Sequence, residues 1–474
     1  MNIKKISGFA LGPLVSAVLG LLSVPLMAWI FSPADIGRMN LLQVLLSFSL
    51  LLTLLGLDQA YVREFHASND RPALLKACFA PGFLLLCVVL LATVPFGCQL
   101  SHWLYGEDNF WFYFFTLICV MANYVSRFLS LILRMQERGL AFSMSQILPK
   151  ALQLMLLGVI VLAGLEKNFL TLLWVTMASM VAVLFVYALN TRDQWQIAMT
   201  AHPSVVQFRL LLRFGLPLVF SGLAYWGLTA TSILVLRANS TFGEMGIYAV
   251  TSSIAGSVAI FQSIFTVVWP PTVYKWVEQG VDMTRVDGIA RQALAVVCGI
   301  FVLVGVFSWL VDYMLPVHYV SVKYLVLCAI APVLLYTLSE ITCVGIGITR
   351  RTMLTIWVTL AALFTNVFLS LWLVPVYGAS GAVIANALAF LVFFVARTEA
   401  SARVWRQFPR QRLYIFVSVA LMLAVGTVAI GPNLPFPVAL VWLGLLPMVV
   451  FFFRSEGAEL LVFGRNAWGN RSDL

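Results

Sequence analysis

The sequence predicts an all-α polytopic membrane protein. The chain of 474 residues is 62% hydrophobic and only 10% charged, and its apolar residues gather into fourteen runs of 18 residues or more. An ordinary soluble domain carries roughly 25% charged residues. So few charges cannot cover the surface of a globular protein of this length, and a chain this apolar does not stay disordered in water. The composition therefore excludes soluble globular and disordered proteins.

Each of the fourteen runs is long enough to cross roughly 30 Å of hydrocarbon as a helix. The runs are about twice as long as a barrel strand and show no alternation of apolar and polar residues, so strands are excluded. An open sheet edge in lipid would also leave backbone groups unpaired. The expected transmembrane helices are 8–31, 40–60, 77–97, 110–132, 141–164, 168–190, 212–236, 246–270, 289–311, 321–346, 352–374, 379–396, 412–430 and 436–453.

The positions of lysine and arginine predict the orientation, because these cations resist translocation and collect on the cytoplasmic side. With the N-terminus and its Lys4 and Lys5 placed inside, 23 Lys and Arg side chains fall on the cytoplasmic side. The opposite side has only Arg38, Lys167, Arg237 and Lys323. Both termini are therefore predicted to be cytoplasmic. The same bias accounts for the net charge of +10 without nucleic acid as a partner.

The two halves of the chain carry similar short motifs at corresponding places, which is typical of transporters built from repeats. Leu11–Val15 (LGPLV) in the first run matches Gly215–Val219 (GLPLV) in the seventh. Asp35-Ile36-Gly37 after the first run matches Glu244-Met245-Gly246 after the seventh. Each copy holds six crossings, and an even number keeps both copies in one orientation. We therefore expect two six-helix lobes related by a pseudo-twofold axis along the membrane normal, plus two C-terminal helices.

The repeat sets the expected domain boundaries. Helices 1–6 form an N-lobe over residues 1–190, a cytoplasmic linker covers 191–211, and helices 7–12 form a C-lobe over 212–397. Residues 398–474 hold a cytoplasmic loop, helices 13 and 14, and a cytoplasmic tail.

Further motifs point to a family. Gly56-Leu57-Asp58 leads to Arg63 at the end of the second run, and Pro375–Ala382 joins the eleventh and twelfth runs. With the opening Gly-Pro helix, Asp35-Ile36-Gly37 and the repeat, this pattern over residues 5–397 resembles the polysaccharide flippases of the Wzx type, in the multidrug/oligosaccharidyl-lipid/polysaccharide exporter superfamily. The resemblance implies a central cavity that opens alternately to each membrane face. It also implies a cargo of undecaprenyl-pyrophosphate-linked oligosaccharide, such as an O-antigen unit of lipopolysaccharide, in a bacterial inner membrane.

Such a headgroup cannot cross bare hydrocarbon, because stripping water from its charges and hydroxyls costs on the order of tens of kcal/mol. A flippase therefore needs a wet path with basic side chains at membrane depth. Arg127 in the fourth run and Lys150 in the fifth meet this requirement, and we expect both to bind substrate. The alternative is that each extends to the interface or pairs locally.

Two carboxylates within apolar runs are candidates for gating or ion coupling. Glu340 occupies the repeat position of Arg127, so we expect the two to pair and to close the cytoplasmic side until cargo pyrophosphate competes for Arg127. Two alternatives stay open for Glu340, a coupling proton and a structural hydrogen bond. Asp58 lies near the cytoplasmic interface beside Arg63 and Glu64, where a solvated carboxylate without a direct role is also common.

Four cations mark the expected cytoplasmic mouth, where a pyrophosphate headgroup is first met. They are Arg63, Arg134, Arg213 and Lys275, called the mouth cations below. We expect them to bind substrate, although each is equally explained as a cytoplasmic anchor. The first run has no cation after Lys5, whereas the lipid II exporters of the superfamily carry arginines there, so the position of the phosphate seat stays open.

Two other functions remain as alternatives. A cation-coupled multidrug antiporter of the same superfamily needs a deep acid in the N-lobe, and the first run contains none. A membrane glycan polymerase or ligase needs catalytic residues on a large outer loop, whereas the longest expected outer connection, 98–109, holds the single His102 and no Lys or Arg. We therefore predict a transporter and not an enzyme.

No cofactor or metal is expected, because the seven cysteines show no CxxC spacing and no Walker loop for ATP is present. The expected partners are the glycan lipid and membrane lipid. Proton or sodium coupling, and contacts with other polysaccharide-assembly proteins, stay open.

Overall fold

The computed structural model describes residues 3–202, 204–351 and 353–459, and these ranges contain helices and no strand. The helices are α1 Ile3–Ile30, α2 Pro33–Leu54, α3 Leu57–Glu64, α4 Arg71–Thr93, α5 Gly97–Tyr105, α6 Phe110–Met135, α7 Gly139–Leu162, α8 Phe169–Asn190, α9 Arg192–Thr200, α10 Val205–Asn239, α11 Phe242–Gly256, α12 Ala259–Glu278, α13 Thr284–Val306, α14 Val311–Met314, α15 Val322–Thr342, α16 Val344–Ile348, α17 Met353–Val404, α18 Gln411–Ile430 and α19 Val438–Phe452. Short 3-10 turns are η1 Val94–Phe96, η2 Ser308–Leu310, η3 Val317–Tyr319 and η4 Gly431–Asn433.

Each predicted apolar run falls mainly on helices of the described residues, which confirms the all-α prediction. Of the described helices, ten are long and apolar enough to cross a membrane, and Val15–Ile30 and Val438–Phe452 are shorter apolar helices. The number of fourteen crossings stays a prediction. The run 246–270 divides into α11 and α12, and α17 carries two predicted runs with a kink at Gly378, where φ is 52° and ψ is −128°.

The prediction of one helix over 40–60 is wrong. Leu55 and Gly56 adopt left-handed conformations with φ of 51° and 71°, so α2 ends at Leu54 and α3 begins at Leu57. A left-handed residue ends the helical hydrogen-bonding pattern, and glycine adopts it without steric cost. The break places Asp58 in the first turn of the short helix α3 rather than inside a span.

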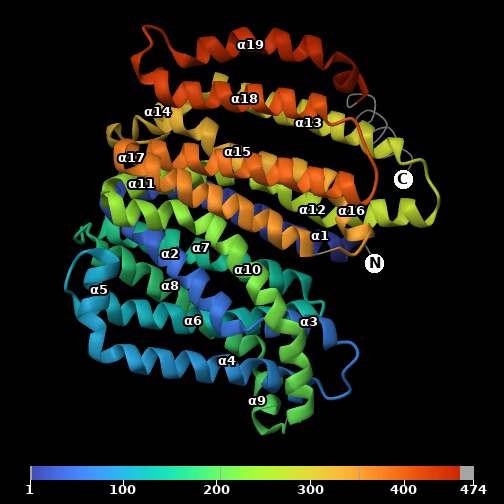
Figure 1. Ribbon diagram of the computed structural model, residues 1–474. Coiled ribbons are helices and arrows are strands. Elements are labelled where there is room, and N and C mark those ends of the chain that lie inside the picture. Colours follow the sequence, from blue (N-terminus) through green and yellow to red (C-terminus); the bar gives the residue numbers. More distant parts are fainter. Residues whose placement is uncertain (1–2, 203, 352, 460–474) are drawn as a thin grey trace. The chain divides into compact units, whose positions relative to one another are not determined.

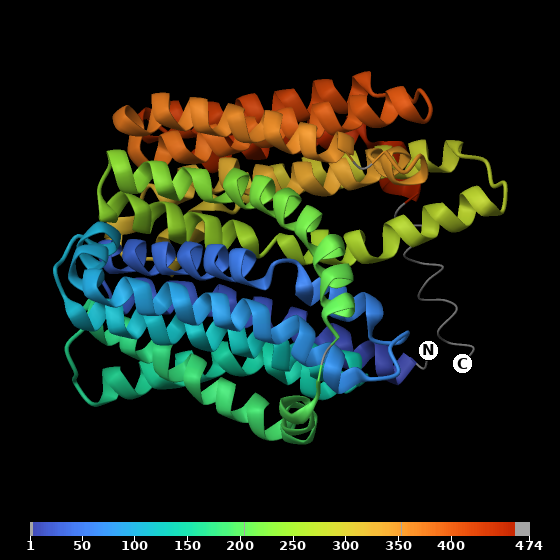
Figure 2. The same ribbon diagram turned by 60° about the horizontal axis from the view of Figure 1, so that its bottom comes forward.

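The chain forms two compact units. Unit 1 comprises the chain up to Leu234 together with Thr241–Gly246, and unit 2 comprises Val235–Ser240 and the chain from Ile247 onward. In unit 1, α1 packs along α7, α6 and α7 pack against α8, and α2, α4 and α6 lie side by side (Figure 1, Figure 2). In unit 2, α15 packs against α12, α13, α17 and α18, while α19 packs against α13.

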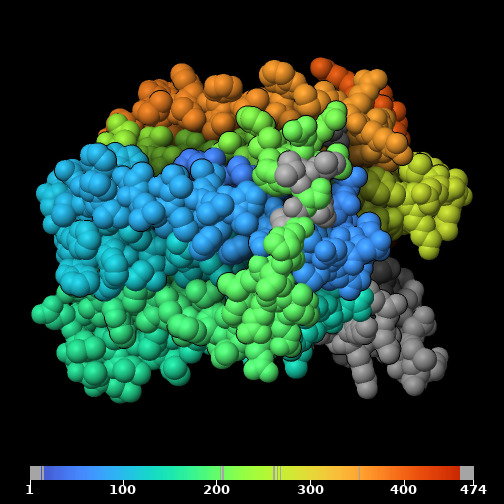
Figure 3. All heavy atoms as spheres, turned by 90° about the horizontal axis from the view of Figure 1, so that it is seen from below, coloured from blue at the N-terminus to red at the C-terminus, as the bar shows by residue number. Residues whose placement is uncertain are grey.

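The outer face of α4 shows how the helices meet their surroundings. Leu84, Val88 and Leu91 are 63%, 64% and 72% exposed, and they follow one side of the helix, which is blue in Figure 3. An apolar stripe of this kind would cause aggregation in water. It is the surface that a membrane helix presents to lipid.

The two copies of the repeated motif contact each other within unit 1. A Cβ on Gly37 at the start of α2 would lie 2.9 Å from the backbone nitrogen of Gly246 on α11, and a Cβ on Gly246 would overlap the carbonyl oxygen of Pro33. The two backbones therefore approach each other so closely that only glycine fits at either position.

Replacing Gly246 by alanine is expected to lower the stability by about 1–3 kcal/mol, because the added methyl group overpacks the contact with Pro33. The unfolding midpoint of the purified protein in detergent measures the effect. Gly256→Ala on the same helix is the control, since a Cβ there meets no atom within 4 Å. Equal midpoints for the two variants would contradict the close approach.

Candidate functional site

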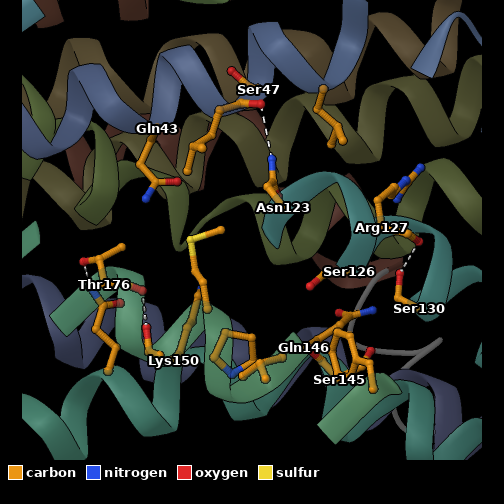
Figure 4. A pocket seen from close by; sticks show the side chains of 18 of the residues that line it. Gln43, Ser47, Asn123, Ser126, Arg127, Ser130, Ser145, Gln146, Lys150 and Thr176 are labelled. Atoms are coloured by element: carbon orange, nitrogen blue, oxygen red, sulfur yellow. Dashed lines mark hydrogen bonds between the residues drawn. The ribbon is translucent and has the colours of Figure 1, made fainter. Parts of the chain in front are cut away.

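A cavity of about 630 Å³ lies within unit 1 between α2, α6, α7 and α8 (Figure 4). Its size falls in the range of small-molecule binding sites. The lining residues are Gln43, Leu46, Ser47, Leu50, Asn123, Ser126, Arg127, Ser130, Phe142, Ser145, Gln146, Pro149, Lys150, Gln153, Thr176, Ser179, Met180, Val183 and Tyr187.

Most of the lining residues carry an amide, a hydroxyl or a positive charge. Arg127 from α6 and Lys150 from α7 are the charged lining residues, and the described lining residues include no carboxylate. Polar side chains in apolar helices are costly unless they face water or a polar partner. The cavity thus brings polar groups and positive charge together inside a bundle of apolar helices.

Helical spacing brings these polar residues to one cavity. Asn123 and Arg127 are four residues apart on α6, and Gln146, Lys150 and Gln153 follow each other at intervals of four and three on α7. Residues at these intervals share one helix face. Our prediction named the two cations and missed the amides. The signal that finds them is the polar stripe at helical spacing within an apolar run.

Pro149 shapes α7 at the cavity wall. Proline has no N–H, so the carbonyl of Ser145, four residues earlier, lacks its usual helical donor. The hydroxyl of Tyr187 on α8 donates to this carbonyl instead. The proline therefore creates an acceptor that ties α7 to α8.

Arg127 forms an ion pair with Asp58 in the first turn of α3. Nη2 of Arg127 lies 2.7 Å from Oδ2 of Asp58, whose side chain is only 7% exposed. Nε2 of Gln59 also donates to this oxygen, at 3.1 Å. The charge of Arg127 is therefore balanced before any ligand arrives. Substrate binding by Arg127 and gating or ion coupling by Asp58 stay predictions, and the structure joins the two residues in one pair.

Lys150 has a different kind of partner. Its ammonium donates to the backbone carbonyl of Ser16 on α1 at 2.8 Å, and no ion pair among the described residues includes it. A backbone carbonyl is a neutral acceptor, so the hydrogen bond does not balance the positive charge. Lys150 is thus the uncompensated charge of the cavity.

Glu340 and Arg127 each have a partner within their own unit, and the expected pairing between them stays a prediction. Glu340 lies on α15 in unit 2, and its Oε1 accepts a hydrogen bond from Nη1 of Arg397 at 2.6 Å. The guanidinium of Arg397 also lies over the rings of Tyr336 and Phe393. Each charge therefore has a partner in its own unit. Arg397 is a partner that the sequence analysis did not identify.

The mouth cations are exposed and do not line the cavity. Arg63 lies over the ring of Phe214, with 4.4 Å between its guanidinium carbon and the ring centroid. Lys275 lies on α12 in unit 2, whereas the other three belong to unit 1. Their contacts with substrate stay predictions.

A bundle of apolar helices with a polar, cationic cavity defines a multi-pass membrane protein, and comparison with known proteins gives its family. Residues 3–276 match the sequence model of a family described as polysaccharide biosynthesis protein, and the chain belongs to this family. This result confirms the predicted resemblance. A search of curated proteins gives no match.

Solved structures with the same fold include transporters and a flippase. The structure is similar to lipid II flippase MurJ in an inward closed conformation, with a TM-score of 0.71 and 11% identity over 96% of this chain and 99% of that chain. It is also similar to a multidrug resistance MATE family transporter of the MOP superfamily. The outward-facing form gives a TM-score of 0.50 and 14% identity over 88% of this chain and 96% of that chain. The inward-facing form gives 0.51 and 16%, over 85% and 96%. At these identities the comparisons establish the fold alone.

The ion pair of Arg127 with Asp58 is expected to contribute about 1–2 kcal/mol of coupling energy in a double-mutant cycle, because removing either partner leaves the other charge partly buried. The cycle uses Asp58→Ala, Arg127→Ala and the double variant, with unfolding by SDS in mixed micelles as the measurement. The matched control is the exposed pair of Arg63 with Glu64, for which we expect about 0–0.5 kcal/mol. Equal coupling energies in the two cycles would contradict the structural role of the buried pair.

Proposed function

We propose that this protein is a flippase that moves undecaprenyl-pyrophosphate-linked oligosaccharide from the cytoplasmic to the outer leaflet of a bacterial inner membrane. The observation that carries the proposal is the cavity of unit 1, with Arg127 and Lys150 and no carboxylate among its described lining residues. Membership of the polysaccharide biosynthesis protein family and the fold shared with a lipid II flippase support it.

The chemistry of the cavity wall suits this cargo. Pyrophosphate needs cations and N–H donors, and sugar hydroxyls need groups that both donate and accept. Gln43, Gln146 and Gln153 supply amides, and Ser126 and Thr176 supply hydroxyls. These groups replace the water that the headgroup loses and so lower the cost of its passage.

The proposed cycle is alternating access by the two predicted lobes, 1–190 and 212–397, with both termini in the cytoplasm. The mouth cations attract the pyrophosphate first. The headgroup then reaches Arg127 and Lys150, while the polyprenyl tail stays in lipid. Binding at Arg127 requires the phosphate to compete with Asp58, which gives the cargo a different affinity for open and closed states. In unit 2, Glu340 paired with Arg397 is the candidate for ion coupling.

The charge of the cavity distinguishes this function from the alternative of a cation-coupled multidrug antiporter. A cavity that binds cationic drugs or a coupling cation needs negative charge. Arg127 and Lys150 repel both kinds of ligand. The positive cavity therefore favours an anionic cargo, and nothing in its lining favours an enzyme over a transporter.

Substitution of either cavity cation is expected to slow translocation. In proteoliposomes with undecaprenyl-pyrophosphate-linked oligosaccharide, Lys150→Ala and Arg127→Ala should each lower the rate about tenfold or more, since a charge-assisted hydrogen bond to phosphate is worth roughly 1.5–3 kcal/mol. The rate is measured as the appearance of glycan that a membrane-impermeant oxidant can reach.

Lys167→Ala is the control, because Lys167 is an exposed residue between α7 and α8 that does not line the cavity. It should translocate at the wild-type rate. Wild-type translocation rates for both cavity variants would contradict the proposed cationic path. Transport of a cationic drug in exchange for protons, with no movement of the glycan lipid, would favour the antiporter.

A further inference from the structure

Helix α1 approaches α7 closely at two levels. The backbone N–H of Gly12 donates to Oγ of Ser143 at 3.0 Å in a buried hydrogen bond. About one turn further along α1, and two turns further along α7, the ammonium of Lys150 donates to the carbonyl of Ser16. A side chain of the cavity wall therefore holds a neighbouring helix through its backbone.

Gly20 makes the second contact possible. A Cβ at this position would lie 2.7 Å from Nζ of Lys150, closer than real Cβ atoms come to a neighbour. In an α-helix the carbonyl of Ser16 also accepts the N–H of residue 20, so Lys150 uses its second lone pair. Because Gly20 has no side chain, the ammonium of Lys150 can reach the α1 backbone.

The partner that Lys150 holds is a weak one for a cation in an apolar setting. The carbonyl of Ser16 is neutral, and the carboxylate of Asp58 is already paired with Arg127. A hydrogen bond between two charged groups is roughly twice as strong as one to a neutral group. A phosphate oxygen in the cavity would therefore be a better acceptor for Lys150 than the helix backbone.

We propose that Lys150 is a displaceable latch. Its ammonium ties α1 to α7 through Ser16, and a pyrophosphate group in the cavity takes the ammonium away and releases α1. The amides of Gln146 and Gln153, one turn on either side of Lys150, complete the phosphate site. This inference rests on the proposed function, which it deepens by naming the phosphate seat and the helix that responds to its occupancy.

The latch predicts opposite effects for two substitutions. Gly20→Ala blocks the approach of Lys150 to the α1 backbone without removing its charge. Pyrophosphate should then bind about threefold to tenfold more tightly, because it no longer competes with one neutral hydrogen bond. Lys150→Gln removes the seat, so affinity should fall about tenfold or more. The measurement is calorimetric titration of the full-length protein in nanodiscs with inorganic pyrophosphate. Gly158→Ala on α7, where a Cβ meets no atom within 4 Å, is the control and should bind as the wild type does.

Amide hydrogen exchange gives a readout that needs no variant. Saturating pyrophosphate should speed exchange in the α1 segment around Ser16 and Gly20 in the wild type, and should leave this segment unchanged in Lys150→Gln. An equal or weaker affinity in a folded Gly20→Ala protein would overturn the latch. Amide exchange in α1 of the wild type that does not respond to pyrophosphate would also overturn the latch. This second test holds even if Gly20→Ala does not fold.

The source of the phosphate is tested with a second ligand. Undecaprenyl pyrophosphate in the nanodisc should compete with inorganic pyrophosphate, and failure to compete would overturn the seat as a site for lipid cargo. The binding experiments do not depend on transport. A protein that shows the expected affinities and exchange but moves no glycan lipid would refute the proposed function and retain the latch, and the reverse result would refute the latch alone.

Discussion

The cost of a charge in an apolar medium is the constraint on which the arrangement of this protein depends. An unpaired ion inside a bundle of apolar helices costs several kcal/mol, so each one needs a partner or access to water. Arg127 has Asp58, and Arg397 has Glu340. Lys150 has a neutral carbonyl and a polar cavity. Arg127 and Arg397 are thus neutralised by carboxylates, and Lys150 gives the cavity its positive charge.

Local backbone features deliver these partners. The left-handed residues Leu55 and Gly56 end α2 and begin α3, which turns Asp58 toward Arg127. Gly20 gives Lys150 access to the backbone of α1. In both cases a position without a side chain or outside the helix allows a polar contact that a regular apolar helix would prevent. Irregular backbone in a membrane protein is tolerated where polar partners satisfy it.

The sequence predicts most helices and the two cations that line the cavity, but it does not predict the partners of these cations. Apolar runs determine where helices form, because lipid leaves the backbone no other way to satisfy its hydrogen bonds. The break at Leu55 was not predicted, because no proline lies there and leucine rarely adopts a positive φ. The partners of Arg127 and Lys150 lie on α3 and α1, far away in the chain. Such contacts follow from how helices pack, and local patterns in a sequence do not reveal that packing.

The repeat explains why pairing of Arg127 with Glu340 was a reasonable expectation and why local pairing serves the cavity better. Positions that correspond in the two copies carry opposite charges, which suggests a bond between them. Each copy instead neutralises its own charge with a partner from a different helix, α3 in one case and α17 in the other. A charge that is balanced inside its own unit does not depend on a contact with the other unit.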